Sequence, residues 1–196
     1  MRQRALWLWG GLGAAFFSVL GLACDDPPPP TQTGAFFVQF TDSGIDCNVN
    51  NHQTELGTVG ATGKPELVAD GTNDAAVVCT VKKSGNGFVV SADLDGAATT
   101  LQLDVSSLAE SQNTIDAAAL GQVKYASSET GGNPYSTPQG QECKFWVDTE
   151  QGQYIKAGEA WFSFDCGAVI SGSESCSVSG YVALKNCTGL PEAEDE

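Results

Sequence analysis

The chain has 196 residues, of which 24 are Asp or Glu and nine are Lys or Arg, so its formal net charge is −15. A surface of this sign repels the phosphates of nucleic acids, which excludes nucleic-acid binding. Charged residues make up only 17% of the chain, while Gly is abundant and Val, Thr and aromatic residues recur in short alternating runs. This pattern is typical of an all-β protein with many turns.

The first 24 residues have the order of a secretory signal. Arg2 and Arg4 precede an apolar run over residues 5–20, and small residues follow it. The stretch Gly21-Leu22-Ala23-Cys24 resembles the lipobox of bacterial lipoproteins, with Gly21 where that family usually has Leu. The resemblance implies cleavage before Cys24 and a diacylglyceryl group on its thiol. The alternative is an ordinary signal-peptidase site cut at the same bond.

The cysteine count favours lipidation, because an odd cysteine in a secreted chain needs its own explanation. Seven cysteines are present, and acylation of Cys24 leaves six for disulfides in an oxidising compartment. Residues 25–30, two acids followed by prolines, are expected to form an extended tether. Removing residues 1–23 takes away two arginines and no acid, so the formal charge of the mature chain becomes −17.

The mature chain is predicted to be a single antiparallel β-sandwich or jelly roll over residues 35–190, because no helical crossovers support a parallel sheet. A lipidated tether over 24–34 precedes it and an acidic tail over 191–196 follows it. Asp95-Gly96 is predicted to form a hairpin turn, and Gly121 is predicted to form a bulge. Residues 106–112 are expected to make a short helical turn, and residues 126–142 a polar loop. Strands are predicted over residues 35–40, 54–60, 75–82, 88–94, 97–105, 114–125, 143–148, 154–165 and 175–185.

The last two strands are predicted to form a hairpin whose register follows from its cysteines. Cys166 and Cys176 bracket the connecting loop symmetrically, so we expect them to face each other and to form a disulfide. That register opposes Phe164 to Val178 on a core face. Cys47–Cys79 is then predicted as the pair within the N-terminal half, and Cys143–Cys187 follows by elimination.

The other face of these strands carries a predicted aromatic row. Alternation places Trp146, Trp161 and Tyr181 on the same, otherwise polar, face of three neighbouring strands. Exposed aromatic rows are typical of surfaces that bind carbohydrate or protein, because rings offer a large rigid area at low entropic cost. The alternative is that a loop or a second sheet covers the rings and makes them part of the core.

Catalytic and metal-binding signals are weak. His52 is the only histidine, and no Gly-x-Ser-x-Gly motif accompanies it. The cysteines are too scattered for a zinc site. Asp70, Thr72 and Asp74 alternate as calcium ligands can, but they fall in a turn, where Asp is common for other reasons. We therefore expect no catalytic residue, no metal and no cofactor.

Together these observations predict a non-catalytic, lipid-anchored binding or envelope protein on the outer side of a bacterial membrane, either in the outer membrane or at the cell surface. Its ligand would be a glycan or a protein that contacts the aromatic row. One alternative is an extracytoplasmic hydrolase that uses paired carboxylates, since 24 acids allow many chance pairs. The other is a purely structural envelope protein.

Overall fold

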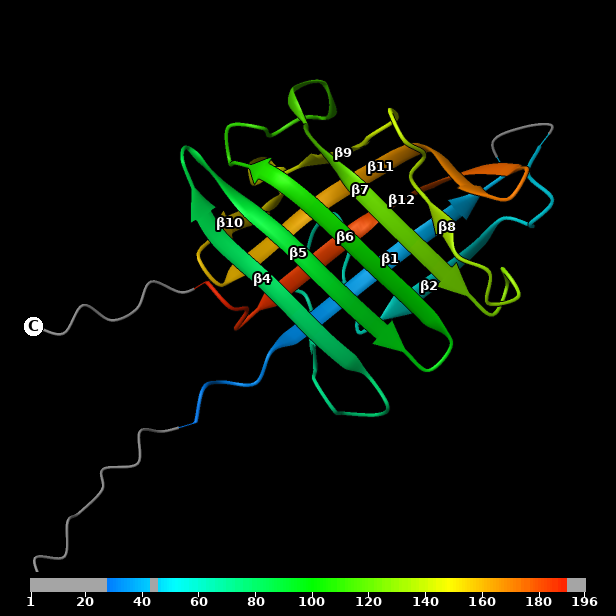
Figure 1. Cartoon of the computed structure of the whole chain (residues 1–196). Helices are drawn as coiled ribbons and strands as arrows, with labels where there is room; N and C mark the ends of the chain where they lie inside the picture. Colours follow the sequence, from blue (N-terminus) through cyan, green and yellow to red (C-terminus); the bar gives the residue numbers. More distant parts are fainter. Residues whose placement is uncertain (1–27, 43–45, 190–196) are drawn as a thin grey trace, which may run out of the picture.

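A computed structural model describes residues 28–42 and 46–189. The predicted signal, Cys24 and the acidic tail over 191–196 lie outside these residues. Twelve strands form one antiparallel sheet that folds back on itself into two layers, which confirms the predicted all-β sandwich (Figure 1). The helices of the described residues are two 3₁₀ turns, η1 (Ile115–Ala117) and η2 (Thr149–Gln151), and neither is long or apolar enough to cross a membrane.

The two layers are joined along one side by short strands that pair with both. One layer consists of β4 (Ala76–Ser84), β5 (Gly87–Gly96), β6 (Thr99–Leu108) and β7 (Ala119–Ser127). The other consists of β2 (His52–Leu56), β1 (Thr33–Thr41), β12 (Glu174–Lys185) and β11 (Glu159–Ser171). Both β8 (Tyr135–Ser136) and β9 (Cys143–Trp146) pair with β7 and β11, whereas β10 (Tyr154–Lys156) pairs with β11 and β3 (Val68–Ala69) with β1.

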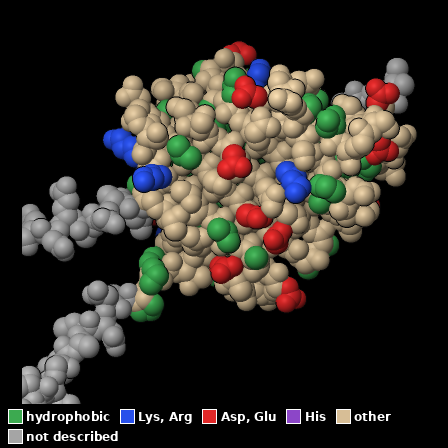
Figure 2. Space-filling model, in the orientation of Figure 1, with side chains coloured by type: hydrophobic (Ala, Val, Ile, Leu, Met, Phe, Trp, Pro, Cys, Tyr) green, Lys and Arg blue, Asp and Glu red, His purple; other side chains and the backbone are tan. Residues whose placement is uncertain are grey.

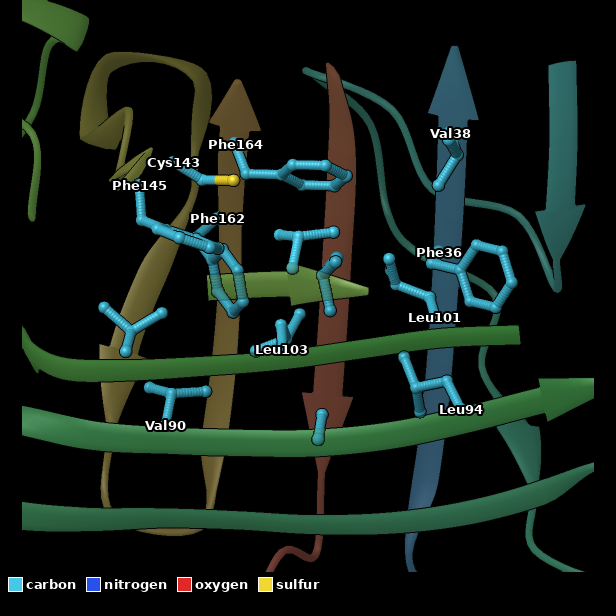
Figure 3. Packing of buried hydrophobic residues seen from close by; sticks show 14 of the residues in the cluster. Phe36, Val38, Val90, Leu94, Leu101, Leu103, Cys143, Phe145, Phe162 and Phe164 are labelled. Carbon is cyan, nitrogen blue, oxygen red and sulfur yellow. The ribbon is translucent and has the colours of Figure 1, made fainter. Parts of the chain in front are cut away.

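The core lies between the layers, whose strands cross rather than run side by side (Figure 3). Alternate residues of each strand point inward, because successive side chains of a strand lie on opposite faces. Phe145 packs against Phe162 and Phe164, with ring centroids 6.1 Å apart in both pairs. The inward residues of β5 and β6 are buried as the alternation predicted: Val90, Ala92, Leu94, Leu101, Leu103 and Val105.

The β5–β6 hairpin forms, but its turn is not at Asp95-Gly96. Those two residues still belong to β5, where Asp95 faces Thr100, and the turn falls on residues 97–98. The observed register opposes Leu94 to Leu101 inside the core, whereas the predicted turn would have opposed Leu94 to an alanine. Burial of matched large side chains thus outweighs the local turn preference of Asp-Gly.

Two further local predictions are wrong in the segment between β6 and β7. β6 continues to Leu108, and the helical turn comes later, as η1, where a strand was expected to begin. Gly121 makes no bulge, since it pairs in register with Val105 and Cys143. A Cβ at this position would lie 2.4 Å from the carbonyl oxygen of Asp104 and 2.9 Å from the ring of Phe145, so the glycine permits close packing.

The β11–β12 hairpin has the predicted faces but a different register. Cys166 faces Val178 rather than Cys176, and Phe164 faces Gly180. The register shifts between Cys166 and Val169, where β11 has two residues opposite one of β12, and this single extra residue forms a bulge before the turn. Since the difference from the predicted register is two residues along most of the hairpin, each side chain keeps its face.

All six cysteines among the described residues form disulfides, but none of the three predicted pairs is right. The observed pairs are Cys47–Cys176, Cys79–Cys187 and Cys143–Cys166. Two of them join residues that are 129 and 108 positions apart. Nearness in sequence was misleading, because β12 lies beside β1 and the chain beyond β12 runs beside β4.

The free edge of β4 is covered by the segment that follows β12. The Val81 N–H donates to the carbonyl of Thr188 at 2.9 Å, and the Thr188 N–H donates to the carbonyl of Cys79 at 3.0 Å. The side chain of Gln32 accepts the Cys79 N–H at 2.8 Å. These contacts occupy backbone groups that would otherwise make β4 a template for another strand.

Candidate functional site

The structure brings two of the three predicted aromatic residues into one row and adds a third ring from β1. Trp146 faces Ser163 on β11, and Ser163 faces Tyr181 on β12. Tyr181 in turn faces Phe37, with ring centroids 6.2 Å apart. The row therefore crosses β9, β11, β12 and β1 on the outer face of their layer, and all three rings are half-buried.

Trp161 does not belong to this row, and the prediction that it forms part of an exposed surface is wrong. Its side chain is only 5% exposed and packs in a separate cluster with Ala35, Val59 and Ala183. The indole N–H donates to the carbonyl of Gly60 at 3.1 Å. Residues 57–67 thus cover Trp161, as the alternative of a covering loop anticipated.

The row borders a hollow of about 390 Å³, which we call the aromatic hollow. Trp146, Tyr181 and Phe37 supply its rings. The remaining lining residues are uncharged and mostly amides and hydroxyls, and no Asp, Glu, Lys, Arg or His lines it. The other lining residues are Gln39, Gln53, Ser163, Phe164, Ser179 and Gly180.

The polar groups around the aromatic hollow are held in place by hydrogen bonds. Gln53 donates through Nε2 to Oε1 of Gln39 at 2.6 Å, and Gln39 donates through its own Nε2 to the carbonyl of His52 at 3.2 Å. Ser163 is bonded at 2.8 Å to the buried side chain of Gln153. Groups fixed in this way lose little conformational entropy when a ligand binds.

Sequence reasoning missed Phe37, Gln39 and Gln53. The alternation over residues 35–40 did hold a signal, since Phe37 falls on the face opposite to its buried neighbours. The sequence could not reveal that β1 pairs with β12, and this pairing places Phe37 beside Tyr181, which is 144 positions further along the chain.

No charged side chain lines the aromatic hollow, but charged residues are its neighbours: Glu55 faces Phe37, and Asp165 faces Ser179. Figure 2 shows acidic side chains scattered over the outer face of the β4–β7 layer. Near the aromatic hollow, Asp165 is half-buried, and this burial raises the pKa of its carboxyl while the Lys144 cation partly offsets the effect. An uncharged hollow is therefore a local exception in a strongly acidic chain.

His52 lies between the layers rather than in a polar loop. Its Nδ1 is 2.8 Å from the carbonyl oxygen of Asn50, which can only accept, so Nδ1–H donates this hydrogen bond. Nε2 lies 3.0 Å from the hydroxyl of Tyr125 and 3.1 Å from that of Ser127, and the ring stacks on Phe40. Ser127 is only 3% exposed, so this histidine–serine pair links β2 to β7 rather than meeting a substrate.

Asp70, considered above as a calcium ligand, has another contact. Asp70 accepts the N–H of Val77 through Oδ1 at 2.9 Å, the usual role of Asp in a turn. Over residues 28–42 and 46–189, no group of three or more His, Cys, Asp or Glu side chains is placed to hold a metal ion.

No protein-family model, curated protein or solved structure matches this chain. The candidate site is therefore defined by its own composition and geometry: three rings, fixed amide and hydroxyl groups, and no lining charge.

Proposed function

We propose that this protein is a lipid-anchored, extracytoplasmic binding protein that holds a neutral carbohydrate in the aromatic hollow. The observation that carries the proposal is the uncharged lining, with three rings, in a chain that has 24 acids. The faces of Trp146 and Tyr181 suit the apolar C–H face of a sugar ring, and the glutamine amides and serine hydroxyls suit its hydroxyl groups. A charged peptide would find no ionic partner among these residues.

The compartment is proposed from the cysteines and the N-terminal segment. Three disulfides support an oxidising location outside the cytoplasm. The signal sequence and Cys24 support a lipid anchor on the outer side of a bacterial membrane, in the outer membrane or at the cell surface. We also propose that the role is non-catalytic, because the single histidine is engaged in the core and the aromatic hollow holds no carboxylate.

Affinity electrophoresis tests carbohydrate binding. The mature chain is run through native gels that contain mannan, xylan or a soluble glucan, and retardation by at least one of them is expected. Trp146→Ala and Tyr181→Ala should each abolish the retardation, whereas Val78→Ala, at an exposed position of the opposite layer, should not change it. Retardation that survives both aromatic substitutions would contradict the proposed site, and so would the absence of retardation in a panel of neutral glycans.

Intact-mass spectrometry of the membrane fraction tests the anchor. The expected mass lacks residues 1–23, carries a diacylglyceryl group on Cys24 and lacks the six hydrogens lost in forming three disulfides. Cys24→Ser should release the protein from the membrane. Recovery of the unprocessed chain with free thiols from cytoplasm would contradict the proposed location.

A further inference from the structure

A second hollow, of about 530 Å³, lies on the outer face of the same layer. We call it the lysine hollow. Its apolar wall is formed by Trp161, Tyr154 and Leu67, together with Pro65 and Ala183. The charged side chains that line it are Lys64 and Lys185, with no acid among the lining residues. The rest of the lining is Gly63, Gln151, Gly152 and Leu184.

The two lysines are available to a ligand. Among the described residues the one ion pair is Lys156–Glu159, at 3.2 Å, so Lys64 and Lys185 have no carboxylate partner there. Both are exposed. The nearby acid Glu159 is already engaged, since it also accepts the hydroxyl of Tyr154 at 3.2 Å. The charged side chains of the lysine hollow are therefore two cations without a carboxylate partner among the described residues, in a chain whose net charge is −15.

We propose that the lysine hollow binds an anionic amphiphile. Its acid group, a carboxylate, sulfonate or phosphate, contacts Lys64 and Lys185, and its chain or ring lies on Tyr154 and Leu67, beside the small part of Trp161 that is exposed. Apolar walls with a few well-placed polar groups are the usual composition of a small-ligand site, and two lysines supply charge-assisted hydrogen bonds to the acid group. This proposal is independent of carbohydrate binding in the aromatic hollow.

The position of the lysine hollow indicates two sources for such a molecule. Lys185 faces Thr33, the first residue of β1, and Leu67 precedes the β3 strand that pairs with the same end of β1. The lysine hollow thus lies at the end of the layer where β1 begins. A ligand can come from the lipids of the anchoring membrane or from free amphiphiles in solution.

The test uses dodecanoate below its micelle concentration, with titration calorimetry of the mature chain. One-to-one binding is expected, and Lys64→Gln and Lys185→Gln should each weaken it by about three- to tenfold. Leu67→Asp should abolish it. Lys124→Gln, on the outer face of the other layer, is the matched control and should change nothing. Circular dichroism verifies that every variant is folded.

Dodecyltrimethylammonium is the decisive comparison. The net charge of the molecule favours the cation, so a preference for dodecanoate can come only from local lysines. Flotation with phosphatidylglycerol vesicles and with phosphatidylcholine vesicles distinguishes the two sources: lysine-dependent flotation with the anionic vesicles indicates membrane lipid, and its absence alongside dodecanoate binding indicates a free amphiphile.

Three results would overturn the proposal. The first is equal or tighter binding of the cationic amphiphile. The second is dodecanoate binding that is indifferent to both lysine substitutions. The third is binding that appears only when residues 190–196 are removed, which would mean that the acidic tail of the chain itself occupies the lysine hollow.

Discussion

Two tryptophans on the same face of one layer have different environments. Trp146 is half-buried at the rim of the aromatic hollow, whereas Trp161 is buried under residues 57–67 and hydrogen-bonded to Gly60. Alternation along the strands placed both rings on the outer face correctly. It could not reveal which of them a distant loop covers, because that depends on contacts about 100 residues apart in sequence.

The difference predicts unequal effects on stability. Trp161→Ala should lower the free energy of unfolding by about 3–5 kcal/mol, because it leaves a cavity and an unpaired Gly60 carbonyl. Trp146→Ala should lower it by less than about 1.5 kcal/mol, since the ring is partly solvated already. Urea denaturation of the two variants measures both values. Equal losses would show that residues 57–67 do not shield Trp161 in solution.

Tyr135 predicts a loss of stability in alkaline solution. Burial, together with the hydrogen bond that its hydroxyl donates to Glu174, raises the pKa of Tyr135 to about 12. The folded state therefore retains this proton at a pH where the unfolded chain, with a tyrosine pKa of about 10, has lost it. Its stabilising contribution is complete below pH 10 and declines as the pH rises towards 12.

The check is a series of urea midpoints between pH 9 and pH 12. The native chain should lose stability more steeply over this interval than Tyr135→Phe, which has no proton to lose at that position. Tyr181→Phe, at the half-buried rim of the aromatic hollow, is the matched control and should follow the native curve. If Tyr135→Phe follows that curve as well, the hydroxyl of Tyr135 is not the group responsible.

At the scale of strands, the sequence predicted most elements and faces but not their registers. The hydrophobic alternation located β1, β4, β5, β6, β9 and β12 to within a few residues, whereas the single strand predicted over 154–165 is in fact β10 and the first half of β11, separated by a turn. It missed the irregularity between Cys166 and Val169, because nothing in the local pattern marks an extra residue there. It also placed the β5–β6 turn on Asp95-Gly96, because turn propensity is local whereas the match of Leu94 with Leu101 is not.

Peptide mapping distinguishes the observed disulfides from the predicted ones. Trypsin releases four peptides that contain the bridged cysteines. The first contains Cys47 and Cys79 and ends at Lys82, because trypsin does not cleave after Lys64, which precedes proline. The other three are residues 125–144, 157–185 and 186–196. The observed pairs join all four into a single species that only reduction separates. The predicted pairs would instead have linked only 125–144 to 186–196, with internal bridges in the other two peptides. Recovery of those separate species would contradict the structure.

For the molecule as a whole, the least predictable feature is that the two ends of the chain build the same layer. The aromatic hollow requires Phe37 of β1 to lie next to Tyr181 of β12, and no local sequence pattern predicts that these two strands pair. The disulfides follow the same arrangement. Cys79–Cys187 is the bond that connects β4, the edge of one layer, to the chain leaving β12 in the other.

Removal of this bond should loosen one edge of the sandwich selectively. In the double variant Cys79→Ala/Cys187→Ala, the amides of β4 should exchange with deuterium at least tenfold faster, because the segment that covers the β4 edge is no longer held there. Cys143→Ala/Cys166→Ala removes a bond between neighbouring strands of the other layer and should leave β4 exchange unchanged. If deuterium exchange of the β4 amides became faster by the same factor in both variants, the disulfides would act only on global stability.

The position of β1 also decides how the domain responds to traction. The chain enters the fold at Thr33, directly into a strand that is flanked by β12 along nine residue pairs and by β2 on its other side. A pull on the N-terminal segment along the strand axis therefore strains these ladders together, in shear, instead of peeling their hydrogen bonds apart one by one. A domain suspended by its N-terminus would keep its fold under drag that would unzip an edge strand.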